Sequence, residues 1–188
     1  MTLRPGSFPV AIFVPPPDCA LSSEALLRLS AEAYAPGQKD CFDELCRSET
    51  GKPRFPQAPG VHFSVTHSGG QWLAAFSEAP VGLDLQIHRS CAIEALSRRF
   101  FHPAETAWLE ARGFAPESFF DLWAAKESYV KFTGRGIAGG LDGFSVVNEK
   151  GFLSAVDGTA LRFLPWEPGW SLCLSSSPGP VDFFPLNV

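Results

Sequence analysis

The segment 116–132 reads as a helix whose side chains could bind a metal ion and a phosphate. At about 100° per residue, one stripe of this helix carries Phe120, Trp123, Glu127 and Lys131. The aromatic residues should be buried, and a buried carboxylate and ammonium at the end of their stripe would suit a metal and a phosphate. The alternative is an exposed Glu127–Lys131 pair, which stabilises a helix by only about 0.3–0.5 kcal/mol.

Asp84 and Gln86 form the polar side of a predicted strand, VGLDLQI (81–87). Strand alternation turns the apolar residues to the other face: Leu83, Leu85 and Ile87. A carboxylate in such an apolar segment costs free energy unless a partner satisfies it. Asp84 therefore either faces solvent, which is the common arrangement for one side of a strand, or belongs to a polar site.

His67 ends another predicted strand, just before Ser68-Gly69-Gly70. A glycine-rich bend allows backbone N–H groups to approach an anion closely. A single histidine at such a position can equally be structural. Gly51-Lys52-Pro53 reads as a loop with one exposed lysine, which means little by itself.

These residues lie on a mixed series of short elements. We expect helices from Ser22 or Ser23 to about Tyr34, and over about 90–101, 103–112 and 116–132. We expect a strand at 9–14, a hairpin of 61–68 with 72–77, and a strand at 81–87. Closing strands are predicted at 144–148, 161–164, 170–175 and 181–184.

Each half of the chain begins with a strand, followed by helix and further strands. The fold class predicted is therefore α+β, with two similar lobes that meet near residue 80. Residues 1–80 would form the N-terminal lobe, and residues 81–188 would form the C-terminal lobe that carries the motifs described above.

Composition and charge limit the classes of function. The chain has 188 residues and a formal net charge of −5, so we expect no nucleic-acid partner. Its five cysteines form no Cys-x-x-Cys pair, which indicates reduced thiols. Proline interrupts the apolar stretch in residues 1–17, so we read no membrane span or signal peptide there and expect a cytoplasmic protein without membrane contact.

Taken in order, several segments resemble the successive motifs of Sfp-type phosphopantetheinyl transferases, in the holo-acyl-carrier-protein synthase superfamily. The motifs are GKP (51–53), VTHSGG (65–70), VGLDLQ (81–86), RRFFHPAE (98–105), WAAKESYVK (123–131), GRGI (134–137) and LDGFSV (141–146). The resemblance covers roughly residues 21–147 and is strongest over 81–146.

The resemblance implies both a fold and a reaction. The family fold is a pseudo-twofold pair of α/β lobes with coenzyme A between them. Its members use Mg²⁺ to transfer 4′-phosphopantetheine from coenzyme A to a serine of an acyl carrier protein or carrier domain, releasing adenosine 3′,5′-bisphosphate. Members with two fused lobes are commonly monomers, so we expect a monomer.

The resemblance also assigns roles to residues of the C-terminal half. Asp84 and Glu127 would be the main metal ligands, and Lys131 would contact the phosphates. Lys126 would add positive charge nearby. Glu105 matches the glutamate proposed as general base toward the carrier serine, although a glutamate in the first turn of a helix is also stabilised by the helix dipole alone.

In the N-terminal half, the resemblance gives roles in binding coenzyme A. His67 and Ser68 would hold phosphates, and Lys52 and Pro53 would lie along the adenine and its ribose phosphate. Arg28 aligns with a structural helix position.

Two departures from the family pattern bear on the site. Gln86 stands where many members have a second acidic ligand, so we expect a weaker metal site, with water between Gln86 and the ion. The N-terminal lobe is also short, because only about seven residues separate Val14 from Ser22. Basic residues to hold the 3′-phosphate of coenzyme A are not evident there.

Arg89, Arg98 and Arg99 could attract an acidic carrier protein, with Phe100 and Phe101 adding apolar contact. Solvated arginines and core phenylalanines are the alternative. Two other functions also stay open. One is a coenzyme A- or carrier-binding relative with weak or no turnover, and the other is a Mg²⁺-dependent phosphohydrolase, although the sequence contains no P-loop.

Overall fold

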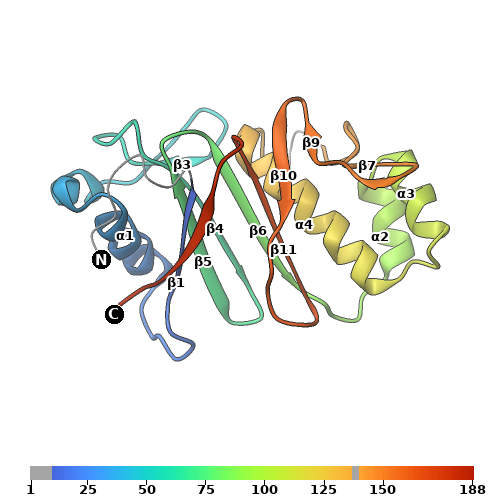
Figure 1. Ribbon diagram of the computed structural model, residues 1–188, viewed down its shortest axis with the longest axis horizontal. Helices are drawn as coiled ribbons and strands as arrows, with labels where there is room; N and C mark the ends of the chain where they lie inside the picture. The colour runs from blue at the N-terminus through green and yellow to red at the C-terminus, as the bar shows by residue number, and fades with distance from the viewer. Residues whose placement is uncertain (1–9, 137–139) are drawn as a thin grey trace.

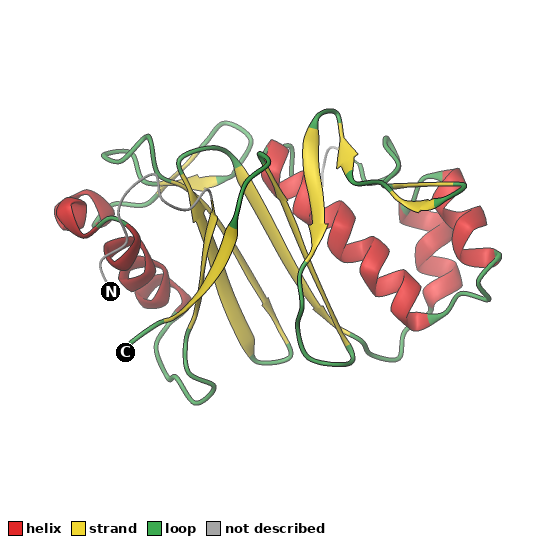
Figure 2. Cartoon of the chain, in the orientation of Figure 1, coloured by secondary structure: helices red, strands yellow, loops and turns green. Residues whose placement is uncertain are grey.

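The computed structural model describes residues 10–136 and 140–188. Two four-stranded sheets occupy the centre of the molecule, and helices cover their outer sides (Figures 1 and 2). The α+β fold class expected from the sequence is confirmed. Pro9 of the first predicted strand and Ile137 of the motif GRGI lie outside the described residues.

The first sheet has the strand order β12-β1-β5-β4. Its members are β1 (Val10–Val14), β4 (His62–Ser68), β5 (Gln71–Ser77) and β12 (Val181–Pro185). The predicted hairpin is confirmed, since β4 and β5 pair from His62 opposite Ser77 to Ser68 opposite Gln71. Gly69 and Gly70, with φ of 50° and 83°, supply the two positive φ angles that a two-residue hairpin turn requires.

One helix covers the outer face of this sheet (Figure 1). It is α1 (Ser23–Tyr34), and the Ser22 side chain caps it by accepting a hydrogen bond from the Ala25 N–H, as the sequence predicted. A 3₁₀ segment (Pro36–Phe42) and a small ribbon of β2 (Cys46–Arg47) and β3 (Pro53–Arg54) follow. Aromatic residues fill the core between α1, this segment and the sheet: Phe13, Phe42, Phe55, Phe63 and Phe76.

The second sheet has the order β6-β11-β10-β9. Its strands are β6 (Val81–Ile87), β9 (Ala155–Val156), β10 (Thr159–Phe163) and β11 (Trp170–Ser176). A separate ribbon joins β7 (Val147–Asn148) to β8 (Gly151–Phe152). The helices on this side are α2 (Ile93–Phe100), α3 (Pro103–Glu110) and α4 (Pro116–Thr133).

The predicted strand at 144–148 is shorter than expected. Only Val147 and Asn148 pair with β8, because the preceding residues form a turn. In this turn the Ser145 hydroxyl interacts with the backbone of Val147, and the Val146 N–H donates to Glu105 Oε1 instead of to a strand. A side-chain acceptor from a distant helix cannot be read from local alternation.

The helix α4 packs directly on β6 and β11 and ends at Gly134, whose φ of 70° is a left-handed helix cap. Gly82 permits this close approach. A Cβ atom at Gly82 would lie 1.9 Å from the Ser128 carbonyl oxygen and 2.4 Å from the Phe132 nitrogen. Only glycine therefore allows the helix to lie this near to the strand.

The two sheets meet across an apolar layer from both lobes, made of Val10, Ile12, Leu73, Ala75, Val81, Leu83, Leu85, Leu172 and Leu174. Hydroxyl groups of β4 add a polar connection. Ser64, Thr66 and Ser68 each accept a hydrogen bond, at 3.0 Å, from a backbone N–H of β6: those of Leu83, Leu85 and Ile87. These bonds fix the register between the lobes at the place where Asp84 lies.

The last strand returns to the first sheet. β12 pairs in parallel with β1, from Val181 opposite Val10 to Pro185 opposite Val14. The division into residues 1–80 and 81–188 therefore does not describe the last strand, which completes the N-terminal sheet. Alternation predicts that a segment is a strand but does not determine which sheet it joins.

None of the helices in residues 10–136 and 140–188 has the length and apolar character needed to cross a membrane. All five cysteines are free thiols.

Candidate active site between the lobes

Asp84 is the centre of a polar site enclosed between the lobes. Asp84 is 3% exposed, and α4 covers the face of β6 on which Asp84 lies. Gln86 Nε2 donates to Asp84 Oδ2 at 2.8 Å, and Thr66 Oγ1 donates to Oδ1 at 3.3 Å. The solvent-facing alternative for Asp84 is therefore wrong, because a helix occupies the space that solvent would fill.

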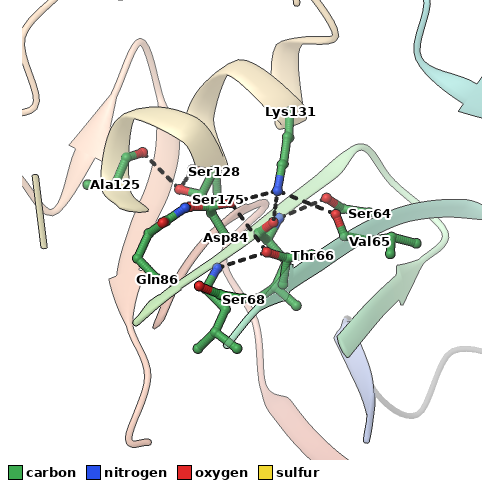
Figure 3. Close-up of polar contacts among 12 residues, drawn as sticks. Ser64, Val65, Thr66, Ser68, Asp84, Gln86, Ala125, Ser128, Lys131 and Ser175 are labelled. Carbon is green, nitrogen blue, oxygen red and sulfur yellow. Dashed lines mark hydrogen bonds and ion pairs between the residues drawn. The ribbon is translucent and has the colours of Figure 1, made fainter. Parts of the chain in front are cut away.

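Lys131 extends from the last turn of α4 to Asp84, as Figure 3 shows. Its Nζ atom lies 2.6 Å from Asp84 Oδ1, 3.1 Å from the Leu83 carbonyl oxygen and 3.4 Å from the Val65 carbonyl oxygen. These acceptors come from β4 and β6, which belong to different lobes. The Lys131 side chain is still 29% exposed, so a ligand can reach it.

Glu127 lies one helical turn before Lys131, and its Oε1 atom is buried with no hydrogen-bond partner among the residues that the structure describes. Burial raises the pKa of this carboxyl, the nearby Asp84 carboxylate raises it further, and Lys131 opposes the rise. The exposed Glu127–Lys131 pair considered from the sequence is wrong, because Glu127 is 7% exposed and Lys131 binds Asp84.

Asp84 and Glu127 together fit a hard divalent cation. A buried carboxylate oxygen without a partner, next to a second carboxylate, is costly in the protein alone and favourable around a cation. Within the described residues no group of three His, Cys, Asp or Glu side chains could hold a metal. The two carboxyl groups that lie close together here are those of Asp84 and Glu127. Gln86 donates to Asp84 through its nitrogen, which makes it a support for Asp84 in this arrangement.

A cavity of about 360 Å³ opens beside these residues. Glu127 and Lys131 line it from the C-terminal lobe, Lys52 lines it from the loop before β3, and Pro53 lines it from the start of β3. Lys52 Nζ donates to the carbonyl oxygens of Lys131, at 2.6 Å, and Val81, at 3.0 Å. Burial lowers the pKa of Lys52 to about 8. The loop lysine thus joins the lobes and forms one wall of the cavity.

His67 and Ser68 lie on the same strand as Thr66 but do not line this cavity. The Ser68 hydroxyl accepts the hydrogen bond from the Ile87 N–H, and His67 is exposed at the end of β4. The phosphate-binding roles expected for His67 and Ser68 therefore stay predictions from the family resemblance.

Glu105 and Lys126 lie elsewhere, inside the C-terminal lobe. Lys126 Nζ donates to Glu105 at 2.7 Å and to the Phe144 carbonyl oxygen at 2.6 Å, and both side chains are 0% exposed. Glu105 also accepts from the N–H groups of His102 and Val146. The predicted position of Lys126 beside the phosphate-binding residues needs correction, because its side chain is buried, leaves α4 on another side from Glu127 and does not line the cavity. The geometry favours a structural role for Glu105 over the role of base.

Two positioning residues could not be recognised from the sequence. Thr66 accepts a hydrogen bond from the Leu85 N–H and donates one to Asp84, so it orients the carboxylate from the other lobe. Gly82 allows α4 to approach β6. Both lie inside quoted motifs, but a threonine in an alternating strand and a glycine beside an aspartate carry no local signal of these contacts.

A larger groove of about 680 Å³ lies away from this site. Its lining is mainly proline and aromatic side chains, including Pro16, Trp166 and Phe183, and it contains no charged side chain. We therefore place the chemistry at the smaller cavity, which Glu127 and Lys131 line.

Comparison with known proteins agrees with this position. Residues 80–170 match the family model described as the 4′-phosphopantetheinyl transferase superfamily. This segment contains Asp84, Gln86, Glu127 and Lys131. The family recognised from the sequence motifs is confirmed. Curated relatives with the same family name resemble more of the chain.

A 4′-phosphopantetheinyl transferase of Bacillus subtilis is 37% identical over 128 residues, which cover 67% of this chain and 56% of the relative. The 4′-phosphopantetheinyl transferase Sfp of Bacillus subtilis strain 168 is 37% identical over 100 residues, covering 52% and 44%. The 4′-phosphopantetheinyl transferase gsp of Aneurinibacillus migulanus is 37% identical over 93 residues, covering 48% and 38%. The chain thus spans about half the length of these phosphopantetheinyl transferases.

Proposed function

We propose that this protein transfers the 4′-phosphopantetheine group from coenzyme A to a serine of an acyl carrier protein or carrier domain, releasing adenosine 3′,5′-bisphosphate. The observation that carries the proposal is the cluster of Asp84, Glu127 and Lys131 beside an open cavity between the lobes. It lies in the segment that matches the phosphopantetheinyl transferase superfamily. The names of the relatives, 4′-phosphopantetheinyl transferases, indicate the reaction.

Asp84 and Glu127 would hold Mg²⁺ with their carboxylate oxygens. Mg²⁺ prefers a small number of carboxylates together with phosphate and water oxygens, and two buried carboxylates meet that preference. When bound, the ion would neutralise charge on the pyrophosphate of coenzyme A as the bond to the leaving phosphate breaks. The unpartnered Glu127 oxygen supports this assignment, because a cation is the partner that such an oxygen lacks.

Lys131 has two tasks in this proposal. Its ammonium holds Asp84 Oδ1 at 2.6 Å and so fixes the direction of the carboxylate. The same group lines the cavity, where it would attract the phosphates of coenzyme A. Its hydrogen bond to the Val65 carbonyl oxygen, at 3.4 Å, is the longest of its contacts and the first that a phosphate oxygen would replace.

Gln86 and Thr66 orient Asp84 from opposite sides. Because Gln86 contributes no charge, the metal would be held more weakly than in members with a third carboxylate. Replacing Gln86 with glutamate should then lower the Mg²⁺ concentration needed for half-maximal transfer. An unchanged Mg²⁺ requirement would show that this position does not influence the ion.

The general base toward the carrier serine remains a prediction from the family resemblance. Glu105 could take this role only after releasing Lys126, since the hydrogen bonds of its carboxylate are all internal. A base role predicts that Glu105→Gln loses kcat while the fold and the binding of coenzyme A persist. A structural role predicts that stability falls instead.

The carrier would dock near the arginines that precede α3. Arg98 forms ion pairs with Glu94 at 3.0 Å and Glu110 at 3.5 Å, which reduces the positive charge it offers. Phe101 is buried in the core, so it is not available to a partner. Replacing Arg98 and Arg99 with glutamate should raise the KM for the carrier more than that for coenzyme A, and an equal change in both would oppose docking here.

One assay tests the proposed reaction. The protein is incubated with coenzyme A, Mg²⁺ and an apo carrier domain, and the intact mass of the carrier is measured. A gain of one phosphopantetheine group supports the transferase. Binding of coenzyme A without that gain would instead support a relative with weak or no turnover, and release of phosphate without a carrier would support a phosphohydrolase.

A further inference from the structure

The strand β12 has a long open edge. It is the red strand that leads to the C-terminus in Figure 1, and within the described residues it pairs with β1 alone. The other edges of the two four-stranded sheets are covered or short. Those of β4 and β6 face each other through the hydroxyl hydrogen bonds between the lobes, and β9 has two residues. A long strand edge without cover is a surface on which another strand can pair.

The backbone groups at this open edge belong to the odd-numbered residues of β12. The Leu186 N–H donates to the Val14 carbonyl oxygen at 2.8 Å, and the Pro180 carbonyl oxygen accepts a hydrogen bond from β1 at 3.3 Å. Successive residues of a strand turn their backbone groups to opposite edges, so the even-numbered residues of β12 face β1. The N–H and carbonyl groups of Val181 and Phe183 therefore point outward.

The open edge is complementary to itself. When two copies of β12 lie antiparallel with Phe183 opposite Phe183, each of these residues donates its N–H to the carbonyl oxygen of the other. Each Val181 N–H then meets the carbonyl oxygen of Pro185. The Pro185 nitrogen, which carries no hydrogen, also faces the open edge, where a strand tolerates proline. Because the pairing is twofold and uses the open edge of both copies, assembly stops at two.

Apolar side chains surround this edge. The Phe183 ring lies 6.0 Å from that of Trp166, and both line the larger groove of about 680 Å³. Five large hydrophobic side chains of the described residues are exposed, and two of them, Phe183 at 39% and Val188 at 58%, lie in this groove. Opposite residues of paired strands place their side chains on the same face, so the twofold pairing brings the two Phe183 rings together, each beside a Trp166 ring.

Charge favours a second copy over an acidic carrier protein as the occupant. No charged side chain lines the groove, so it offers no basic group to an acidic partner. Two copies of a chain with a formal net charge of −5 also need a contact without like charges. The twofold pairing meets this need, because Asp182 of one copy lies opposite Phe184 of the other and not opposite the second Asp182.

We propose that two copies of this chain pair through β12 and form a twofold dimer in which their first sheets become one continuous sheet. This arrangement differs from the monomer expected from the family resemblance, and it does not rest on the proposed reaction. The groove and the cavity at Glu127 and Lys131 share no lining residue, so each copy keeps its own site. A single strand pair makes a small interface, and small interfaces are weak and transient.

The test is sedimentation equilibrium of the full chain over about 1–500 µM, a range that detects a weak dimer. The unchanged protein should pass from monomer to dimer as its concentration rises. Phe183→Lys should raise the Kd of the dimer at least about tenfold, because it places two like charges opposite each other in the aromatic cluster.

Phe163→Lys is the matched control. Phe163 is also 39% exposed and also lies on a strand, β10, but it does not line the groove. The control introduces the same charge at an equally exposed phenylalanine and should leave the Kd of the dimer unchanged. Thermal unfolding of both variants checks that the fold persists.

Amide hydrogen exchange measured by NMR tests the pairing in the unchanged protein. At a concentration where about nine chains in ten are dimeric, the Val181 and Phe183 N–H groups should exchange about tenfold more slowly than in the monomer, because they exchange only when the pair opens. The Asp182 N–H faces β1 in both states, so its exchange rate should change little.

A protein that stays monomeric over the whole concentration range would overturn the proposal. A dimer that Phe183→Lys leaves intact, or that Phe163→Lys weakens equally, would overturn it as well, since the contact would then lie elsewhere. Unchanged exchange at Val181 and Phe183 in the dimer would do the same without any substitution.

Discussion

The helix α4 supplies one lysine to each of two carboxylate–lysine ion pairs. The N···O distances of the two pairs are nearly the same, but their surroundings are very different. Lys126 meets Glu105 at 2.7 Å, and Lys131 meets Asp84 at 2.6 Å. In the Glu105 pair both side chains are 0% exposed, and backbone groups complete the hydrogen bonding. In the Asp84 pair the lysine is 29% exposed and borders a cavity.

The difference extends to the neighbouring groups. The Glu105 carboxylate accepts hydrogen bonds from Lys126, His102 and Val146, and the pair joins α3, α4 and the turn at Phe144. Beside Asp84, Glu127 Oε1 has no hydrogen-bond partner in the described part of the chain, and the pKa of this carboxyl is raised. A satisfied buried pair stabilises one structure, whereas a group left unsatisfied next to a cavity indicates a site for a ligand. Predictions that separate the two pairs follow, from the largest effect to the smallest.

Glu105→Ala should reduce the free energy of unfolding by about 3–5 kcal/mol, because it leaves the Lys126 ammonium buried without its counter-charge. Urea unfolding measures this loss. Glu94→Ala is the control, since it breaks an exposed pair with Arg98 and should cost less than about 1 kcal/mol. Equal effects of the two substitutions would contradict the structural role of the Glu105 pair.

Gly82→Ala should move α4 away from Asp84 and reduce stability by about 1–3 kcal/mol, the usual cost of overpacking. The affinity for Mg²⁺ should fall as well, because Glu127 lies on the displaced helix. Gly60→Ala is a suitable control, as a Cβ there meets nothing within 4 Å. Unchanged Mg²⁺ binding in Gly82→Ala would show that the distance between helix and strand does not set the metal site.

Glu127→Gln should increase the free energy of unfolding of the metal-free protein by about 1 kcal/mol near neutral pH. This is a common size for the stabilisation that follows when a residue needed for function is replaced. Because its pKa is raised in the fold, Glu127 keeps a proton that the unfolded chain loses above the ordinary value of 4.5. Stability therefore falls as pH rises from that value through the raised pKa, and Glu127→Gln should remove this part of the pH dependence. Urea unfolding across acidic and neutral pH without Mg²⁺ measures it, and loss of stability in the variant would contradict the account.

The smallest effect concerns Lys52. With its pKa at about 8, this ammonium loses its charge as pH rises from 7 to 9, so the affinity for coenzyme A should fall roughly two- to fivefold. Lys52→Arg should keep the affinity nearly constant over this range, since arginine stays protonated. Calorimetry at pH 7 and 9 checks both, and an identical decline in the two proteins would exclude Lys52 as the source.

Much of the fold follows from local patterns. Alternation and capping predicted β1, the β4–β5 hairpin, β6, α1 and α4, because each depends on neighbouring residues in the chain. The return of β12 to the first sheet did not follow, since the choice of partner strand depends on contacts between distant segments. The same reason applies to the turn at Ser145, which is held by Glu105.

The site could be predicted in part. The helical spacing of Glu127 and Lys131, together with the strand position of Asp84, was enough to propose that these three residues form one site for a metal and a phosphate. The separation of Lys126 from that site could not be predicted. Adjacent helical residues point about 100° apart, and only packing decides which direction leads to the core. The contact of Thr66 with Asp84 also depends on how the lobes meet.

The central claim is that Asp84 and Glu127 form the metal site while the Glu105 pair is structural. The most direct measurement is the stability of the protein as Mg²⁺ is added, compared with that of Glu127→Gln. At about 100 times the Kd, Mg²⁺ should stabilise the unchanged protein by about 2.7 kcal/mol and leave the variant unaffected. Equal stabilisation of both proteins would contradict the claim.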